Sequence, residues 1–194
     1  MKEKLLFATV ALFTVFTLSA QEAKYELKSA IIKKSMEMFG QKMDATLYFD
    51  DYGKMESVSM TMEMQGTSMR MRTITKGDVI TVLNLDNKTG NKITLPESSI
   101  NFLKLTQEAK DKYKVKELGD ETIAGKPCKK YSMEMSQMGQ DVSVTTWIWK
   151  GIALKTISEA AGMSITETAT DIKENVAVDA ENFAIPSDFS IQEM

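Results

Sequence analysis

The sequence predicts a mainly β protein, with one antiparallel sheet of about ten or eleven strands that a short central helix interrupts once. Two observations lead to this fold class. Apolar and polar residues alternate along many short segments, as they do in strands with one buried face. Turn signals rich in Gly, Asn and Asp separate these runs at intervals of roughly eight to twelve residues, which is the spacing of an all-β protein.

The clearest element is a methionine-rich hairpin over residues 58–72. Two alternating runs flank Gln65-Gly66, where glycine favours a two-residue turn because it tolerates positive φ. Side chains alternate between the two faces of a strand, so five methionines share one face while Arg70 and Arg72 lie on the other. The register predicts three opposite pairs, namely Met60 with Met71, Met62 with Met69, and Met64 with Thr67.

The first twenty residues have the layout of a secretory signal peptide. A short charged start precedes the uncharged apolar run 5–18, and small residues end at Ala20, the expected cleavage site. We therefore expect an exported protein, periplasmic or secreted, whose residues 21–194 form a single domain with no transmembrane segment.

In the first half of that domain, residues 25–38 are predicted to form a long strand. Its apolar residues change parity between Leu27 and Ala30, which indicates a β-bulge. Residues 43–49 alternate cleanly as a half-buried strand, and residues 79–85 are apolar on both faces. Residues 100–112 fit an amphipathic helix with Ser98 or Ser99 as its N-cap.

The second half is predicted to return to β structure. The expected strands cover residues 115–118, 128–138, 142–150, 151–157 and 163–173. Gly119 to Gly125 connects the first two of these strands. The tail from Glu174 contains Phe183 and is expected to cross the domain as an irregular strap.

Composition excludes several classes of chemistry. The chain has no histidine and one cysteine, so it lacks His-dependent triads, common zinc sites and iron–sulfur ligand sets. We expect no enzyme activity, no cofactor and no metal site of these kinds. Without the leader, 22 basic and 26 acidic residues remain, a balance that gives no basic surface for nucleic acid. Cys128 is interpreted as a small buried hydrophobe in preference to a thiol activated by the neighbouring lysines.

The order of elements resembles the LolA/LolB-like superfamily of exported lipoprotein carriers, and especially a branch known only as a domain of unknown function. The residues that carry the resemblance are 48–54, the insertion 96–112 and the segment 119–131. The resemblance implies a strongly curved half-barrel with helical pieces against its concave face. It also implies an apolar cavity, which in the characterised carriers takes lipoprotein acyl chains.

Three interpretations of the methionines compete. They fill an irregular core, they line a cavity for a lipid or another flexible ligand, or their thioethers bind Cu(I). The partners to consider are a lipid or lipoprotein acyl chain, or an exported protein bound by a filled structural domain. The candidate ligand-binding residues are Met60, Met62, Met69, Met71, Met133, Met135 and Trp147.

Overall fold

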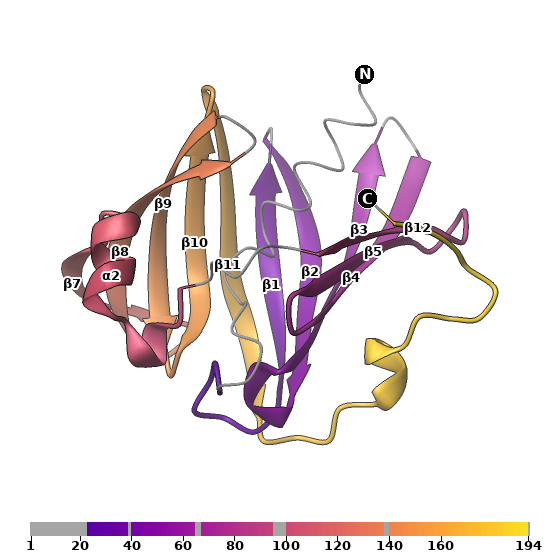
Figure 1. Cartoon of the computed structure of the whole chain (residues 1–194), viewed down its shortest axis with the longest axis horizontal. Coiled ribbons are helices and arrows are strands. Elements are labelled where there is room, and N and C mark those ends of the chain that lie inside the picture. The colour runs from indigo at the N-terminus through magenta and orange to yellow at the C-terminus, as the bar shows by residue number, and fades with distance from the viewer. Residues whose placement is uncertain (1–22, 39, 65–66, 95–99, 138–139, 194) are drawn as a thin grey trace.

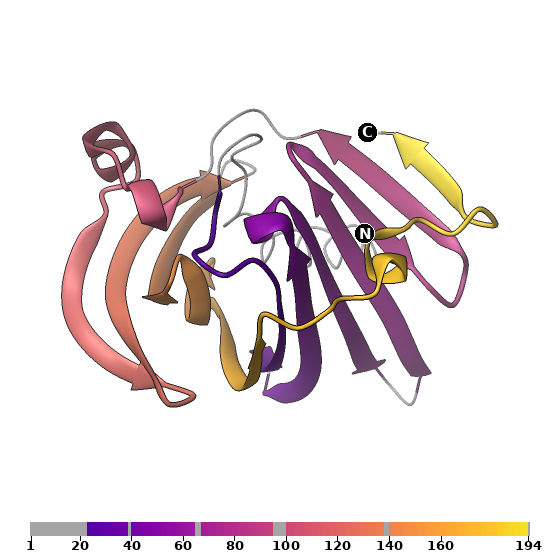
Figure 2. The same ribbon diagram turned by 90° about the horizontal axis from the view of Figure 1, so that it is seen from below.

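A computed structural model describes residues 23–38, 40–64, 67–94, 100–137 and 140–193. These residues form one open, strongly curved sheet with a short α-helix beside it (Figure 1). Seen from below, the sheet curves like a half-barrel (Figure 2), and we call its concave side the hollow. The predicted fold class is therefore confirmed. The leader over residues 1–20 lies outside the described residues.

Twelve strands are present in the described ranges, one or two more than expected. Their order across the sheet is β12-β6-β5-β4-β3-β2-β1-β11-β10-β9-β8-β7, and every pair is antiparallel except β12 with β6. The strands are β1 (Ala30–Met38), β2 (Gln41–Asp50), β3 (Met55–Met64), β4 (Thr67–Lys76), β5 (Val79–Asn84), β6 (Thr89–Thr94), β7 (Lys116–Ile123), β8 (Lys126–Gln137), β9 (Gln140–Trp149), β10 (Ile152–Ala160), β11 (Met163–Glu174) and β12 (Ser190–Glu193).

The methionine hairpin is β3 and β4, and its predicted register is confirmed at all three pairs. The turn at Gln65-Gly66 lies outside the described residues. In β2, the residues predicted to be buried alternate with more exposed neighbours, from Met43 to Phe49. The continuously apolar segment is β5, which is buried on both faces as expected. Local alternation therefore sets the pairing in this half of the sheet.

The chain before Ala30 is not part of the first strand, contrary to the prediction. Tyr25 and Leu27 are buried in an irregular segment, so the change of parity there reflects a bend in the chain and not a bulge. The sheet does contain a bulge nearby, where the β1–β11 register shifts between Lys33 and Lys34. The backbone of residues 24–28 bonds to loops instead of to a neighbouring strand.

The central helical region is shorter than predicted. It consists of the 3₁₀ turn η2 (Phe102–Lys104) and the helix α2 (Gln107–Lys112), which Leu105 and Thr106 separate. The α2 N-cap is Thr106, whose hydroxyl accepts from the Ala109 amide at 3.2 Å. Ser98 and Ser99, the predicted caps, lie outside the described residues. None of the described helices is long and apolar enough to cross a membrane.

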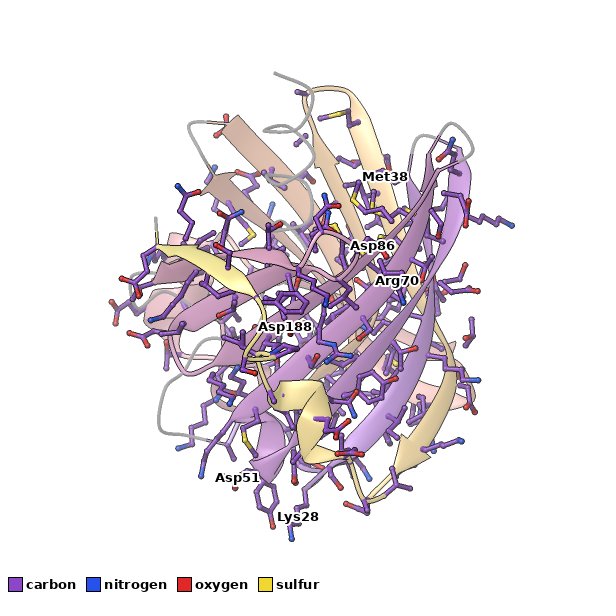
Figure 3. All side chains as sticks on the ribbon, turned by 90° about the vertical axis from the view of Figure 1, so that its right-hand side faces the viewer. Lys28, Met38, Asp51, Arg70, Asp86 and Asp188 are labelled. Carbon is purple, nitrogen blue, oxygen red and sulfur yellow. The ribbon has the colours of Figure 1, made fainter. Side chains whose placement is uncertain are left out.

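The C-terminal tail crosses the outer face of the sheet, as the strap prediction requires, and it also adds the edge strand β12. Its turn η3 (Ala180–Phe183) contacts β3 and β4, and Phe183 is buried there. Arg72, which alternates with Met71, donates to the Glu181 carbonyl at 3.2 Å. Figure 3 shows this tail, with Asp188 on it, in front of the strand that carries Arg70. The strap therefore lies on the face opposite the methionines.

Candidate functional site

One small cavity identifies the concave face of the sheet. Its volume is about 50 Å³, and side chains of β1, β2, β3, β4, β9, β10 and β11 meet around it together with Tyr25 and Phe102. These strands span most of the sheet and can meet around one cavity only on its concave side, so most of the lining side chains point into the hollow. The lining includes Met36, Leu47, Val58, Thr73 and Thr156.

The predicted methionines of β3 and β4 share this face. Val58 lines the cavity, and Met60 and Met62 follow it at the alternate positions of β3. Met60, Met62 and Met71 are buried, and Met69 is partly buried beside them. The structure therefore brings four of the seven candidate residues together on the concave side.

Two further methionines extend the group in a way that the sequence analysis did not identify. Met36 of β1 lies opposite Met43 of β2. The β2–β3 ladder ends at the pair Asp44 and Thr61, and the next residue on each strand is Met43 and Met62, so these two methionines are neighbours. Met62 in turn lies opposite Met69. Alternation within each strand gave the face of Met36 and Met43, but only the strand order shows that a row of thioethers crosses four neighbouring strands.

This methionine face forms an apolar cluster made only of sheet residues. No described helix or loop contributes a member to it. An apolar sheet face normally packs against a second layer, because burial from water is what stabilises it. Among the described residues, this cluster contains no member from a second layer. Its members, which we call the methionine face, are Met36, Met38, Met43, Ala45, Met60, Met62, Met71, Ile80, Val82 and Ile165, with Val58 and Met69 packed against them.

Met133 and Met135 belong to a different cluster on β8. Met133 is buried against Val144, and the η2–α2 segment supplies Phe102 and Leu105 to the same group. These two candidates face the concave side. Val144, which lies opposite Met133, is two residues from Thr146 and so shares its face, and Thr146 contacts the cavity residue Thr156. They lie beneath the helical insertion and apart from the methionine face.

Trp147 does not face the hollow. In the unbroken β8–β9 register it opposes Lys130, three residues from Met133, and so it points to the opposite side of the sheet. Its ring lies between the ammonium groups of Lys130 and Lys155, at 4.7 and 4.5 Å from the ring centroid. Its Nε1 donates to Glu121 at 2.7 Å. These contacts describe a structural role for Trp147 on the outer face.

The hollow also contains charged groups, which the sequence analysis missed. Lys34 and Glu167 form an ion pair with Nζ 2.6 Å from Oε1. Glu56 lies further along and pairs with Lys24 at 3.6 Å. That separation is too long for a hydrogen bond, so Lys24 Nζ and Glu56 Oε1 are buried without a hydrogen-bond partner in the described part of the chain. Alternation along the strands places Lys34 and Glu56 on the buried face. The sequence alone does not suggest that they are buried, because charged side chains are rarely buried unless they are paired.

Burial shifts the ionisation of two groups at this end of the hollow. Desolvation lowers the pKa of Lys24, and the neighbouring Glu56 carboxylate partly opposes that change. Desolvation also raises the pKa of Tyr25 well above its usual value, and the negative charge of Glu56, followed by a hydrogen bond with that carboxylate, adds to the shift. The Tyr25 ring packs on Phe49, with 4.6 Å between centroids. Tyr25 and Lys24 therefore close the hollow with polar groups.

Residues 24–28, which we call the cap segment, cross this end of the sheet. The amides of Lys24 and Tyr25 donate to the Tyr52 carbonyl at 2.9 and 3.2 Å, and the Glu26 amide donates to the Lys150 carbonyl at 3.1 Å. The segment thus joins η1 (Asp51–Gly53) to the β9–β10 turn. Figure 2 shows it as the dark chain crossing the mouth of the curved sheet.

Cys128 is buried, and burial raises the pKa of its thiol above the usual value. Its Sγ donates to the Lys126 carbonyl at 3.4 Å. This agrees with a packed side chain and not with an activated nucleophile. No group of three or more His, Cys, Asp or Glu side chains that could hold a metal ion occurs in the described ranges.

The strongly curved open sheet makes this chain a half-barrel protein. Comparisons with known proteins give its family and show the same fold in solved structures. The chain belongs to the DUF4412 family, a domain of unknown function, whose model matches residues 29–185. No protein of curated function matches the sequence.

Solved structures show the same fold at low sequence identity. An uncharacterized conserved protein from Thermus thermophilus has a TM-score of 0.58 and 9% identity, over 96% of this chain and 99% of that one. MucB from the MucA/MucB complex of Pseudomonas aeruginosa gives 0.54 and 13%, over 93% of this chain and 62% of that one. A second structure, MucB in complex with MucA(peri), gives 0.52 and 12%, over 89% and 58%. The chain therefore spans about three fifths of MucB.

Proposed function

We propose that the chain is an exported, non-enzymatic protein of the LolA-like type that holds a hydrophobic ligand, a lipid or acyl chain, on the concave methionine face. The observation that carries this proposal is the composition of that face. Its apolar members all come from the sheet, and no described helix or loop belongs to the cluster. These methionines are already buried without a guest. A flexible guest would therefore enter by rearranging their side chains, and unbranched methionine side chains repack readily around guests of varied shape.

Binding would be passive. Each square ångström of apolar surface removed from water stabilises the complex by roughly 25 cal/mol, before the cost of immobilising the guest. The four candidates Met60, Met62, Met69 and Met71 would contact the guest together with Met36 and Met43. Met133 and Met135 would bound it on the side of the helical insertion, and Trp147 would not contact it.

Native mass spectrometry of protein purified from its own host tests the proposal. We expect a co-purifying lipid, or uptake of a fatty acid by delipidated protein. A ligand-free mass together with no uptake of fatty acid or lipopeptide would contradict the proposal, and would favour a filled core that serves only as packing.

A protein partner is the second candidate function. MucB, which has the same fold, was solved in complex with MucA. A pull-down that recovers one exported protein, combined with no lipid uptake, would favour this candidate.

Cu(I) binding is a third and lesser candidate. The row formed by Met36, Met43, Met62 and Met69 favours it, because thioethers are soft ligands. Anaerobic titration with Cu(I) tests it, and an affinity weaker than about micromolar would exclude a dedicated site.

A further inference from the structure

On β3 and β4 the concave face changes from polar to apolar along the direction of the strands, whereas Phe49 of β2 and Ile32 of β1 keep the end near the cap segment apolar on the neighbouring strands. On β3 the residues pointing into the hollow are, in order, Glu56, Val58, Met60 and Met62. On β4 the opposing series is Thr75, Thr73, Met71 and Met69. The polar end of both strands lies at the cap segment, and the methionine end lies at the far side of the hollow.

The polar end contains hydrogen-bonding capacity that the described residues leave unused. Glu56 is 5% exposed and lines the cavity, and its Oε1 has no hydrogen-bond partner among the described residues. The Nζ atom of Lys24, which lies behind Glu56, is also buried without a hydrogen-bond partner among the described residues. The two groups attract each other as an ion pair at 3.6 Å. Buried polar groups without a hydrogen bond are costly, so a ligand group that bonds to Glu56 Oε1 would be favoured there.

The charges in the hollow already balance. Lys34 is paired with Glu167, and Lys24 lies beside Glu56. A charged head group would therefore bring an uncompensated charge into a buried site, which is strongly unfavourable. An uncharged head that both donates and accepts hydrogen bonds meets no such penalty.

The size of the cavity limits the head group. A volume of about 50 Å³ accommodates about three to five water molecules at roughly 10–15 Å³ each. A hydroxyl or primary amide group fits this space. Met36 is the methionine that lines the cavity, so a chain attached to the head would reach the methionine face there and continue along it as the buried side chains repack.

From this gradient we propose that the protein selects a single-chain amphiphile with a small uncharged head. The head would hydrogen-bond to Glu56, whose ion-pair partner Lys24 lies behind it, and the tail would lie along the methionines. This inference rests on the proposed function, since it specifies which hydrophobic ligand the concave face takes.

A series of C12 ligands with one tail and different heads tests the selection. The ligands are dodecanamide, dodecanol, dodecane, dodecyltrimethylammonium and dodecylphosphocholine, each competing with Nile red for the purified protein. We expect dodecanamide and dodecanol to bind at least about tenfold more tightly than the other three. Equal affinity across the series would overturn the inference and leave the proposed function standing, whereas no binding of any member would overturn both.

A variant locates the selection. In Lys24→Met/Glu56→Leu both members of this ion pair are replaced by apolar side chains, so no buried charge is left without a partner. We expect this variant to lose the preference for dodecanamide over dodecane while still binding dodecane. Lys114→Met/Glu134→Leu removes an exposed ion pair and is the matched control, which should keep the preference. A preference that survives in the Lys24/Glu56 variant would contradict the assignment, and the wild-type series remains decisive if that variant does not fold.

Discussion

Lys34 and Glu167 form an ion pair inside the hollow of the sheet, with Nζ 2.6 Å from Oε1 and side chains only 9% and 11% exposed. They come from the neighbouring strands β1 and β11, and Lys34 lies at the bulge where the register of these two strands shifts. A charge in such a place is tolerated because its partner is present.

Removing one member of this pair is expected to destabilise the protein strongly. Lys34→Met leaves a buried carboxylate unpaired and should lower the free energy of unfolding by about 3–5 kcal/mol. Lys34→Met/Glu167→Leu should recover most of that loss. Urea unfolding of the two single variants and the double variant measures the coupling.

The exposed pair Lys88 and Asp188 is the control for that cycle. Its side chains are 61% and 55% exposed, so water and salt screen the pair, and a coupling far smaller than that of Lys34 with Glu167 is expected there. If Lys34→Met alone cost no more than the removal of Lys88, the ion pair would not be buried as described.

Gly151 is predicted to be essential for seating the cap segment. It has a φ of +83°, and a Cβ at this position would lie 2.3 Å from the Lys24 carbonyl oxygen. Gly151→Ala should therefore displace residues 24–28, weaken protection of the Glu26 amide from hydrogen exchange, and lower the melting temperature.

Gly162 provides a matched control for that substitution. Its φ is +78°, it also occupies a hairpin turn, and nothing lies within 4 Å of an added Cβ. Gly162→Ala should cost only the strain of a left-handed alanine, about 1–2 kcal/mol. Equal losses in the two variants would show that the contact with Lys24 has no energetic effect.

The sequence was sufficient for the fold class because strict alternation specifies both the strand and its buried face. The pairing of Met62 with Met69 followed from a local turn, which requires no knowledge of distant strands. The neighbourhood of Met43 and Met62 depends on the pairing of β2 with β3, and the cavity depends on curvature that brings β4 and β10 together. These are long-range relationships, and no short sequence pattern encodes them.

Trp147 shows a different limit of sequence reasoning. Its aromatic ring suggested a ligand contact, but parity relative to Met133 determines its face, and that parity is known only once the β8–β9 register is fixed. The buried ion pairs were missed for the opposite reason. A lysine or glutamate at an inward position is normally interpreted as exposed, and only its partner explains its burial.

Tyr25 should make the protein sensitive to alkali. Its folded-state pKa is raised, chiefly by burial and further by Glu56, whereas in the unfolded chain the phenol ionises near its usual value of about 10. The unfolded state then binds fewer protons at high pH, so the Tyr25 contribution is fully present below about pH 10 and is lost as the pH rises above it.

Tyr25→Phe isolates that contribution. Lys24 has a lowered pKa, which makes stability rise with pH up to the usual lysine range and partly masks the effect of Tyr25. The difference between wild type and Tyr25→Phe in urea unfolding at pH 8 to 11 removes the shared Lys24 term. We expect the wild type to lose its advantage above pH 10, and a difference independent of pH would argue against a buried Tyr25 hydroxyl.

Replacing the row of thioethers by leucine separates the candidate functions of the concave face. Leucine nearly conserves the volume and apolarity of methionine, so each of Met36→Leu, Met43→Leu, Met62→Leu and Met69→Leu should cost less than about 1.5 kcal/mol in unfolding free energy. We expect the fourfold variant to remain folded and to take up the same C12 amphiphiles as the wild type, because hydrophobic binding requires apolar surface and not sulfur. Any Cu(I) binding by the wild type should disappear in it, since the soft ligands are gone. Met133→Leu/Met135→Leu alters the separate cluster under the helical insertion and should affect neither readout. Loss of amphiphile uptake in the fourfold variant, with its stability intact, would show that the sulfur atoms and not the apolar surface make the site.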